Sequence, residues 1–269
     1  MKNIISLLVL ICSVAVIIVS CAKKDDSTTT AAAGNIAGGG TTASGTITGN
    51  DNLTGVFHTS WYGQEPSGGC IDNSSALTAY SSAIASDTLS FKKMWIITGA
   101  STFTDSIATY SDATCSTLTS YFNKLYDNVT IGSGLTGLTA GSSPAFPTTA
   151  NKISYTSKSY SLMANTTVSV AKFLSQYGAT VTSGVEMTVD ESSPATEYNI
   201  FATAPMSGST KTYLYLDDGT NTDNYSDWTS EQDTYWKEVD TTAPTAPSVS
   251  GTTPTNDTTP TWSWSAGGG

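Results

Sequence analysis

The sequence of residues 87–97 is DTLSFKKMWII. Leu89 and Phe91 alternate with Ser90 and Lys92, and this period of two is typical of a strand with one apolar and one polar face. A turn around Gly99 follows, and another apolar stretch begins after it. Two such stretches joined by a short turn predict neighbouring antiparallel strands.

Similar stretches, rich in Thr, Tyr, Val, Ile and Phe, recur between clusters of Gly, Asn, Asp or Ser. Nine strands are expected, at residues 56–61, 87–97, 102–110, 120–131 (closed by Gly132), 152–163, 181–189, 197–202, 211–216 and 234–239. One amphipathic helix is expected between N-cap residues at 165–167 and Gly178, because apolar residues there are spaced at i, i+3, i+4 and i+7: Val170, Phe173, Leu174 and Tyr177. These elements predict a mainly β fold, an antiparallel β-barrel with one short helix, since closure removes exposed sheet edges.

The composition excludes several classes of function. Charged residues make up 12% of the 269, and 11 lysines against 22 acidic residues give a net charge of −11. A surface of that sign repels phosphate backbones, so nucleic acid is not an expected partner. A single histidine and four cysteines exclude a two-histidine metal site and a cysteine-rich zinc module.

Residues 1–20 have the features of an export signal. An apolar run over residues 4–19 follows Lys2 and is shorter than the roughly 20 residues that cross a bilayer as a helix. The run ends in Ile18-Val19-Ser20-Cys21, which resembles the bacterial lipobox. The alternative is an ordinary signal peptide followed by a chance cysteine.

The lipobox resemblance implies that the mature chain begins at a lipidated Cys21, and attachment through two acyl chains is lasting. Ala22 stands where an aspartate would resemble the inner-membrane retention signal, so a lipid-anchored outer-membrane location is expected, and the side of that membrane that the domain faces, cell surface or periplasm, stays open. Residues 21–50 are dominated by Thr, Ala, Gly and Ser and contain no aromatic residue. They are expected to form a disordered tether that carries the domain at 51–239.

The cysteines predict one disulfide. Removal of residues 1–20 leaves Cys21, Cys70 and Cys115, and lipidation of Cys21 leaves the other two as a pair in an oxidising compartment. A bridge across about 45 residues stabilises the fold by roughly 4 kcal/mol in the chain-entropy model. The alternative is two unpaired buried thiols.

Short motifs in the proposed domain resemble bacterial lipocalin-like (calycin-type) domains. They are Leu53-Thr54-Gly55-Val56-Phe57-His58-Thr59-Ser60 with Cys70, Tyr110-Ser111-Asp112-Ala113-Thr114-Cys115, and Tyr213-Leu214-Tyr215 with Asp217 followed by Tyr235-Trp236-Lys237. The resemblance implies a lipocalin-like barrel over residues 53–239. The chain departs from the family pattern at Phe57, where the family usually has tryptophan, and between Cys70 and Asp87, where it is longer.

The C-terminal residues differ from the rest. Residues 240–247 form a proline-rich linker, and residues 248–269 resemble the first strands of bacterial immunoglobulin-like repeats. Such a sandwich needs about 100 residues, so the segment is interpreted as a truncated Ig-like domain. Ordering about 25 residues costs more backbone entropy than Val249, Trp262 and Trp264 return on burial. Residues 245–269 are therefore expected to be disordered or loosely extended.

No residue stands out as catalytic. His58 is the one candidate base, but it lies among strand residues and is interpreted as a partly buried strand histidine. Asp217, Asp218 and Asp223 are weak candidates for calcium, although their spacing does not match an EF-hand, and a solvated hairpin loop is favoured. No metal or cofactor is expected.

The sequence thus predicts an outer-membrane or cell-surface lipoprotein with a non-catalytic binding, adhesion or display function. Its expected partners are the membrane, through the lipid anchor, and an extracellular protein or glycan. The alternative is a periplasm-facing carrier of a small apolar ligand, with unknown binding residues in the barrel mouth, where barrels of about eight strands have room for one ligand. An enzyme ranks behind both.

Overall fold

A computed structural model describes residues 43–60, 65–139, 146–205, 210–217, 223–228, 232–238, 248–251 and 262–265. The expected signal peptide, Cys21, most of the expected tether, Asp218 and the expected linker at 240–247 lie outside the described residues. The chain divides into two compact units, Met1–Lys237 and Glu238–Gly269. Within the described part, no helix is both long enough and apolar enough to cross a membrane.

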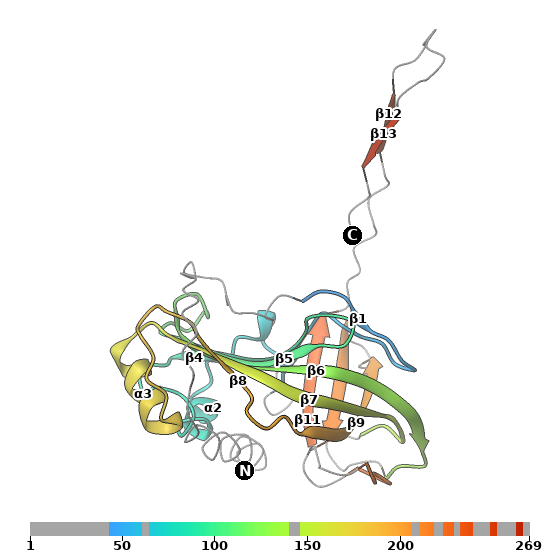
Figure 1. The fold of residues 1–269 in the computed structure, drawn as a ribbon, viewed down its shortest axis with the longest axis horizontal. Helices are drawn as coiled ribbons and strands as arrows, with labels where there is room; N and C mark the ends of the chain where they lie inside the picture. Colours follow the sequence, from blue (N-terminus) through green and yellow to red (C-terminus); the bar gives the residue numbers. More distant parts are fainter. Residues whose placement is uncertain are drawn as a thin grey trace. The chain divides into compact units, whose positions relative to one another are not determined.

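The first unit is built on one antiparallel sheet of nine strands (Figure 1). The strands are β3 (Val56–Thr59), β4 (Ser90–Ile97), β5 (Phe103–Tyr110), β6 (Leu118–Thr136), β7 (Thr149–Ala164), β8 (Met187–Asp190), β9 (Thr196–Pro205), β10 (Lys211–Asp217) and β11 (Gln232–Glu238). Their order is β6-β5-β4-β3-β11-β10-β9-β7-β8, and β6 also pairs with β7. The pairings therefore return to β6 in a ring, which makes the sheet barrel-like and leaves β8 outside the ring.

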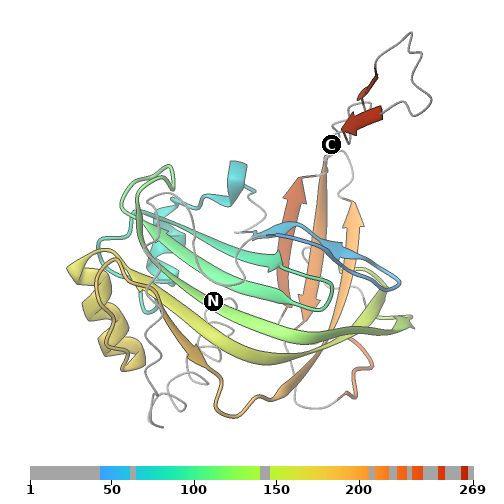
Figure 2. The same ribbon diagram turned by 45° about the horizontal axis from the view of Figure 1, so that its top comes forward.

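A strand is present at each of the nine expected places, but β6 and β7 are longer than predicted, and the strand expected at 181–189 is only the four-residue β8. β6 does not end at Gly132: it continues to Thr136, paired with β7 through register shifts between Asp127 and Thr130 and between Ile131 and Gly134. Bulges of this kind bend a strand without ending it. Figure 2 shows β6 and β7 curving together across the sheet.

The folded domain begins before residue 51, so the expected tether boundary is wrong. β1 (Thr46–Ile47) pairs with β2 (Leu53–Thr54), and Ile47 is 1% exposed within the main core. The sequence interpretation missed this strand because it is two residues long and Ile47 is surrounded by Thr and Gly.

The inner face of the ring is packed with apolar side chains from every ring strand. They form one cluster that includes Phe57, Trp95, Phe103, Tyr126, Ile153, Tyr155, Phe201, Leu214 and Tyr235. The centre of the Phe103 ring lies 3.9 Å from that of Trp95, 4.6 Å from that of Tyr126 and 5.0 Å from that of Tyr155. The interior at this level is a stack of aromatic rings.

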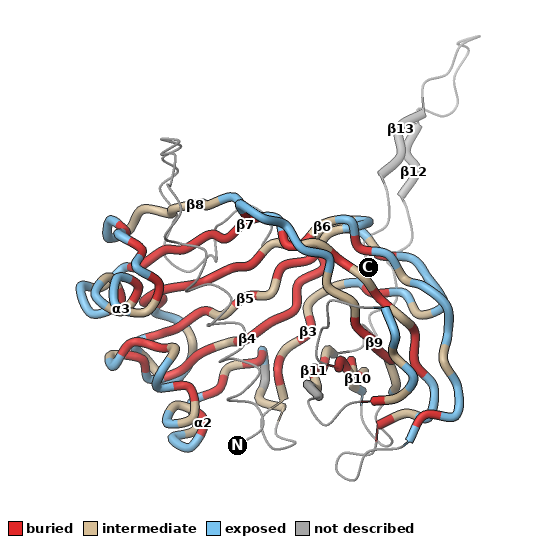
Figure 3. Tube along the Cα trace, turned by 60° about the horizontal axis from the view of Figure 1, so that its bottom comes forward, coloured by how far each residue is buried: buried red, intermediate tan, exposed pale blue. Residues whose placement is uncertain are grey.

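The outer face is also largely covered, which corrects the alternation expected at residues 87–97. Leu89 is 55% exposed, whereas Ser90 and Phe91 are both fully buried. Ser90 is buried because the turn after β5 folds over it, and its hydroxyl donates to the carbonyl of Asp112 at 2.5 Å. Figure 3 shows buried residues along most of β4, β5 and β7.

Two α-helices lie near one end of the sheet (Figures 1 and 2). The expected helix is α3 (Thr167–Tyr177), capped by Thr166, whose hydroxyl accepts from the Ser169 N–H, and ended by Gly178 at φ 64°. Leu174 is 54% exposed, so only part of the predicted apolar face is buried. The helix α2 (Ser74–Ala79) was not predicted. It is six residues long, begins after an Asn73 cap and lies in the long stretch between Cys70 and Asp87.

The second unit contains an antiparallel pair, β12 (Ser248–Gly251) and β13 (Trp262–Ser265). Residues 245–269 were expected to be disordered or loosely extended, and the structure differs by pairing these eight residues. Val249 is opposite Trp264 and Gly251 is opposite Trp262 in this pair. The interpretation from sequence weighed side-chain burial against backbone entropy and did not consider strand pairing.

Deletion of residues 240–269 is expected to leave the melting temperature of the first unit unchanged to within a few degrees, because the two units are separate compact bodies. Thermal unfolding of the full and shortened chains, followed by circular dichroism, measures this. A large fall in melting temperature would show instead that the C-terminal unit stabilises the sheet.

Candidate functional site

The inner face of the ring contains a buried lysine among tyrosines and a carboxylate. We call Lys124, Tyr126, Tyr155, Tyr160 and Glu197 the Lys124 cluster. Lys124 is 4% exposed, and its Nζ lies 3.2 Å from Glu197 Oε1. Its Nζ also lies 4.7 Å from the centre of the Tyr126 ring and 5.7 Å from that of Tyr160. A buried cation is tolerated in a fold when it has such partners.

Strand register brings these residues together. Lys124 and Tyr126 are two residues apart on β6, Tyr160 is opposite Lys124 on β7, and Tyr155 is opposite Glu197 across β7 and β9. Each of these residues is on the face of its strand that points into the ring. The cluster therefore results from three strands that are distant in sequence.

The phenols of the cluster are hydrogen-bond donors at neutral pH. Burial, followed by the charge of Glu197, raises the pKa of Tyr126 and of Tyr155 well above its ordinary value. Burial raises the pKa of Tyr160 as well, and its hydroxyl donates to Glu191 Oε2 at 2.6 Å. Because the Glu197 side chain is 28% exposed, the cluster reaches solvent. It can hydrogen-bond a polar group that reaches Glu197 from solvent.

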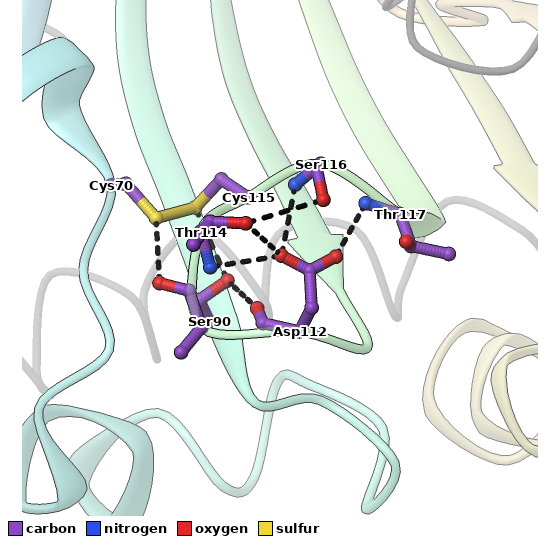
Figure 4. Close-up of a disulfide and its surroundings, with 8 residues drawn as sticks. Cys70, Ser90, Asp112, Thr114, Cys115, Ser116 and Thr117 are labelled. Atoms are coloured by element: carbon purple, nitrogen blue, oxygen red, sulfur yellow. Dashed lines mark hydrogen bonds between the residues drawn. A yellow bond between two sulfur atoms is a disulfide. The ribbon is translucent and has the colours of Figure 1, made fainter.

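The predicted disulfide is formed between Cys70 and Cys115, whose Cα atoms are 5.8 Å apart (Figure 4). It joins the segment after β3 to the turn between β5 and β6. Cys115 has a φ of 53°, which a non-glycine residue rarely adopts. Cys115 Sγ lies 3.2 Å from the hydroxyl of Ser90, so the bridge is also packed against β4.

Asp112 organises the turn that carries Cys115. Its carboxylate accepts from the backbone N–H groups of Thr114 (2.8 Å), Ser116 (3.1 Å) and Thr117 (2.6 Å), and from the Thr114 hydroxyl at 2.7 Å. The Thr114 hydroxyl, followed by these N–H groups, holds the pKa of the Asp112 carboxyl well below its ordinary value. Figure 4 shows the carboxylate at the centre of the turn. Asp112 therefore stabilises the strained turn in its ionised form.

His58 is a partly buried strand histidine, as the sequence predicted. It lies on β3 opposite Trp236 of β11, with the two ring centres 5.2 Å apart. Its Nδ1 is buried and has no hydrogen-bond partner. Burial, followed by the charge of Lys92, lowers its pKa to about 4. Among the described residues, no serine or carboxylate is bonded to His58 in the arrangement of a catalytic triad.

The pKa of His58 predicts a pH dependence of stability. Because the pKa of His58 in the folded chain lies below the ordinary value of 6.5, the unfolded chain takes up the proton first, and stability falls as pH drops from 6.5 towards 4. Between pH 7 and 5.5 we expect a loss of up to about 1 kcal/mol. Urea unfolding at both pH values measures it. His58→Gln should abolish most of this difference, because His58 is the single histidine of the chain; an unchanged difference would contradict the assignment.

The backbone at Gly69 lies directly against the His58 ring, so this position needs a residue without a side chain. Its φ is +69°, and an added Cβ would lie 2.1 Å from His58 Nδ1. Gly69→Ala should therefore destabilise the fold by about 1–3 kcal/mol, measured by urea unfolding. Gly184→Ala is the matched control, because Gly184 has a φ of +75° and nothing within 4 Å of its added Cβ. If both variants lose the same free energy of unfolding, the clash with His58 does not contribute to the effect of Gly69→Ala.

The structure does not assemble the calcium candidates. Asp217 is buried at the end of β10, and Asp223 pairs with Lys152 at 2.8 Å. Asp218 lies outside the described residues. Across the described ranges, no three His, Cys, Asp or Glu side chains are grouped to hold a metal ion.

The sequence interpretation missed the Lys124 cluster and a second group formed by Glu65, Lys211 and Trp236. The available signal for Lys124 was a charged residue within the mainly apolar stretch between Tyr121 and Tyr126. Its partners could not be predicted, because they come from β7 and β9. Comparisons of the chain with protein-family models and with curated proteins found no match.

Proposed function

We propose that this chain is a lipid-anchored bacterial protein of the outer membrane or cell surface, attached through Cys21. In this proposal its nine-stranded unit is a lipocalin-like barrel with a non-catalytic binding or display function. In the same proposal the C-terminal unit, which contains the β12–β13 pair, is an Ig-like segment of the display stalk.

The observation that carries the display function is the packed interior of the ring. Aromatic rings with centres 3.9–5.0 Å apart fill it around Phe103. A rigid scaffold of this kind presents its loops and outer surface to a partner, an extracellular protein or glycan. The Cys70–Cys115 bridge supports the location, because structural disulfides persist in oxidising compartments.

One observation favours the alternative of a periplasm-facing carrier. The Lys124 cluster lies on the inner face, and Glu197 within it is 28% exposed. A ligand bound there would need a polar group to meet the ammonium, carboxylate and phenols of the cluster. The carrier function is therefore better suited to a ligand with a polar end than to the wholly apolar ligand expected from the sequence.

Radioactive palmitate labelling and protease treatment of intact cells test the proposal. The native chain should be labelled and cleaved at the surface, while Cys21→Ala should be unlabelled and leave the membrane fraction. Survival of the labelled domain under protease would favour the periplasmic carrier. Membrane retention of the processed Cys21→Ala variant would contradict lipid anchoring.

A further inference from the structure

The outer face of β3, β10 and β11 carries charged and aromatic side chains that the proposed function leaves unused. Lys211 of β10 has its Nζ 4.2 Å from the centre of the Trp236 ring on β11. The same Nζ donates to the carbonyl of Glu65 at 3.0 Å and lies 3.4 Å from Glu65 Oε2. Lys211 therefore connects the indole of Trp236 with the carboxylate of Glu65.

Polar atoms around Lys211 are buried and unsatisfied. Trp236 is 0% exposed, and its Nε1 has no hydrogen-bond partner. The second oxygen of Glu65, Oε1, and His58 Nδ1 are also buried without a partner. Each unsatisfied buried group costs about 1–3 kcal/mol, so a native protein retains several of them together only for a reason.

We propose that Lys211 and Trp236 form a binding site for the carboxylate group of a small organic acid. In the free protein the site is occupied by Glu65 of the same chain. Glu65 provides an acceptor for the Lys211 ammonium but leaves the Trp236 N–H unbonded. A free carboxylate that displaces Glu65 accepts from both donors and releases Glu65 Oε1 to water.

The donor set selects this ligand class. An ammonium and an indole N–H both donate and neither accepts, so their common partner is an acceptor, and a carboxylate offers two oxygens and a complementary charge. Lys92 adds positive charge beside His58, close enough to lower the pKa of the imidazole. In a chain with a net charge of −11, this is a local site that favours an anion.

Occupation by Glu65 makes binding competitive. A tethered side chain acts at an effective concentration in the millimolar range or above, so a weak external carboxylate is largely excluded from the native protein. Removal of the Glu65 side chain should therefore raise the affinity for an external carboxylate by about ten-fold or more. This effect is independent of lipid anchoring and of the Lys124 cluster.

The test follows the indole N–H signal of Trp236 by NMR in the full chain labelled with ¹⁵N. Trp236→Phe identifies the signal by its loss. In Glu65→Ala, sodium acetate should shift the signal saturably, with a dissociation constant at least about ten-fold lower than in the native chain. In Glu65→Ala with Lys211→Met, acetate should cause no saturable shift, while the other indole signals stay in place and show that the variant is folded.

Two controls make the result specific. Sodium chloride at equal ionic strength should not shift the signal. Asp223→Ala, which removes the carboxylate paired with Lys152 on another part of the surface, should behave as the native chain. A Trp236 signal in Glu65→Ala that ignores acetate would overturn the proposal. So would an equal response to acetate and chloride, which would mean that the site does not select a carboxylate. An acetate shift that persists without Lys211 would also overturn it, because Lys211 would then not be part of the site.

Discussion

Phe103→Ala is expected to lower the free energy of unfolding by about 3–5 kcal/mol, the range for removal of a buried phenylalanine. Phe103 is fully buried, and its ring is in contact with those of Trp95, Tyr126 and Tyr155. The substitution leaves a cavity that three large rings cannot fill without moving. Urea unfolding followed by circular dichroism measures the loss.

Leu174→Ala is the matched control for this prediction. It also removes a large apolar side chain, but Leu174 is 54% exposed on α3, so a change within about 0.5 kcal/mol is expected. A loss of less than about 1 kcal/mol in Phe103→Ala would contradict the packed interior, on which the display function rests. It would favour the carrier function, because an interior that tolerates the cavity has room for a ligand.

Replacement of Cys70 and Cys115 together by alanine is expected to lower the free energy of unfolding by about 4 kcal/mol. The disulfide connects residues 45 apart in sequence, and its loss restores that loop entropy to the unfolded chain. Thermal unfolding should show a fall of about 10 °C.

A reductant provides the internal control for the disulfide prediction. Dithiothreitol should lower the melting temperature of the native chain towards that of the double variant and leave the variant unchanged. A native chain that unfolds at the same temperature with and without reductant would contradict a stabilising role for the bridge. Asp112→Asn distinguishes the contribution of the turn to stability from that of the disulfide. It weakens the hydrogen bonds from Thr114, Ser116 and Thr117 and leaves the disulfide formed.

Local patterns were sufficient to predict the nine strands and α3. Alternating residues and turn clusters act over a few positions, and the spacing of Phe173 and Tyr177 between Thr166 and Gly178 is a local signal of the same kind. The disulfide followed from counting cysteines, because only one pair remained. Short elements were missed where the local signal was weak: α2 has six residues and β1 has two.

The alternation at residues 87–97 shows why burial could not be predicted in the same way. Ser90 is buried because the turn at Asp112, 22 residues later, folds onto it. Lys124 is buried because Glu197 and Tyr160 reach it from β9 and β7. A pattern along one strand carries no information about what covers either of its faces.

The order and the types of the strands and the net charge of −11 are properties of the sequence, because each depends on neighbouring residues or on counts. The ring of pairings from β6 to β7, the Lys124 cluster and the Glu65–Lys211–Trp236 contact depend on contacts between residues 13 to 146 positions apart. Those contacts arise when strand register and sheet curvature bring distant side chains together. For that reason the candidate sites could be identified only from the folded structure, and the sequence alone did not show that these residues lie together.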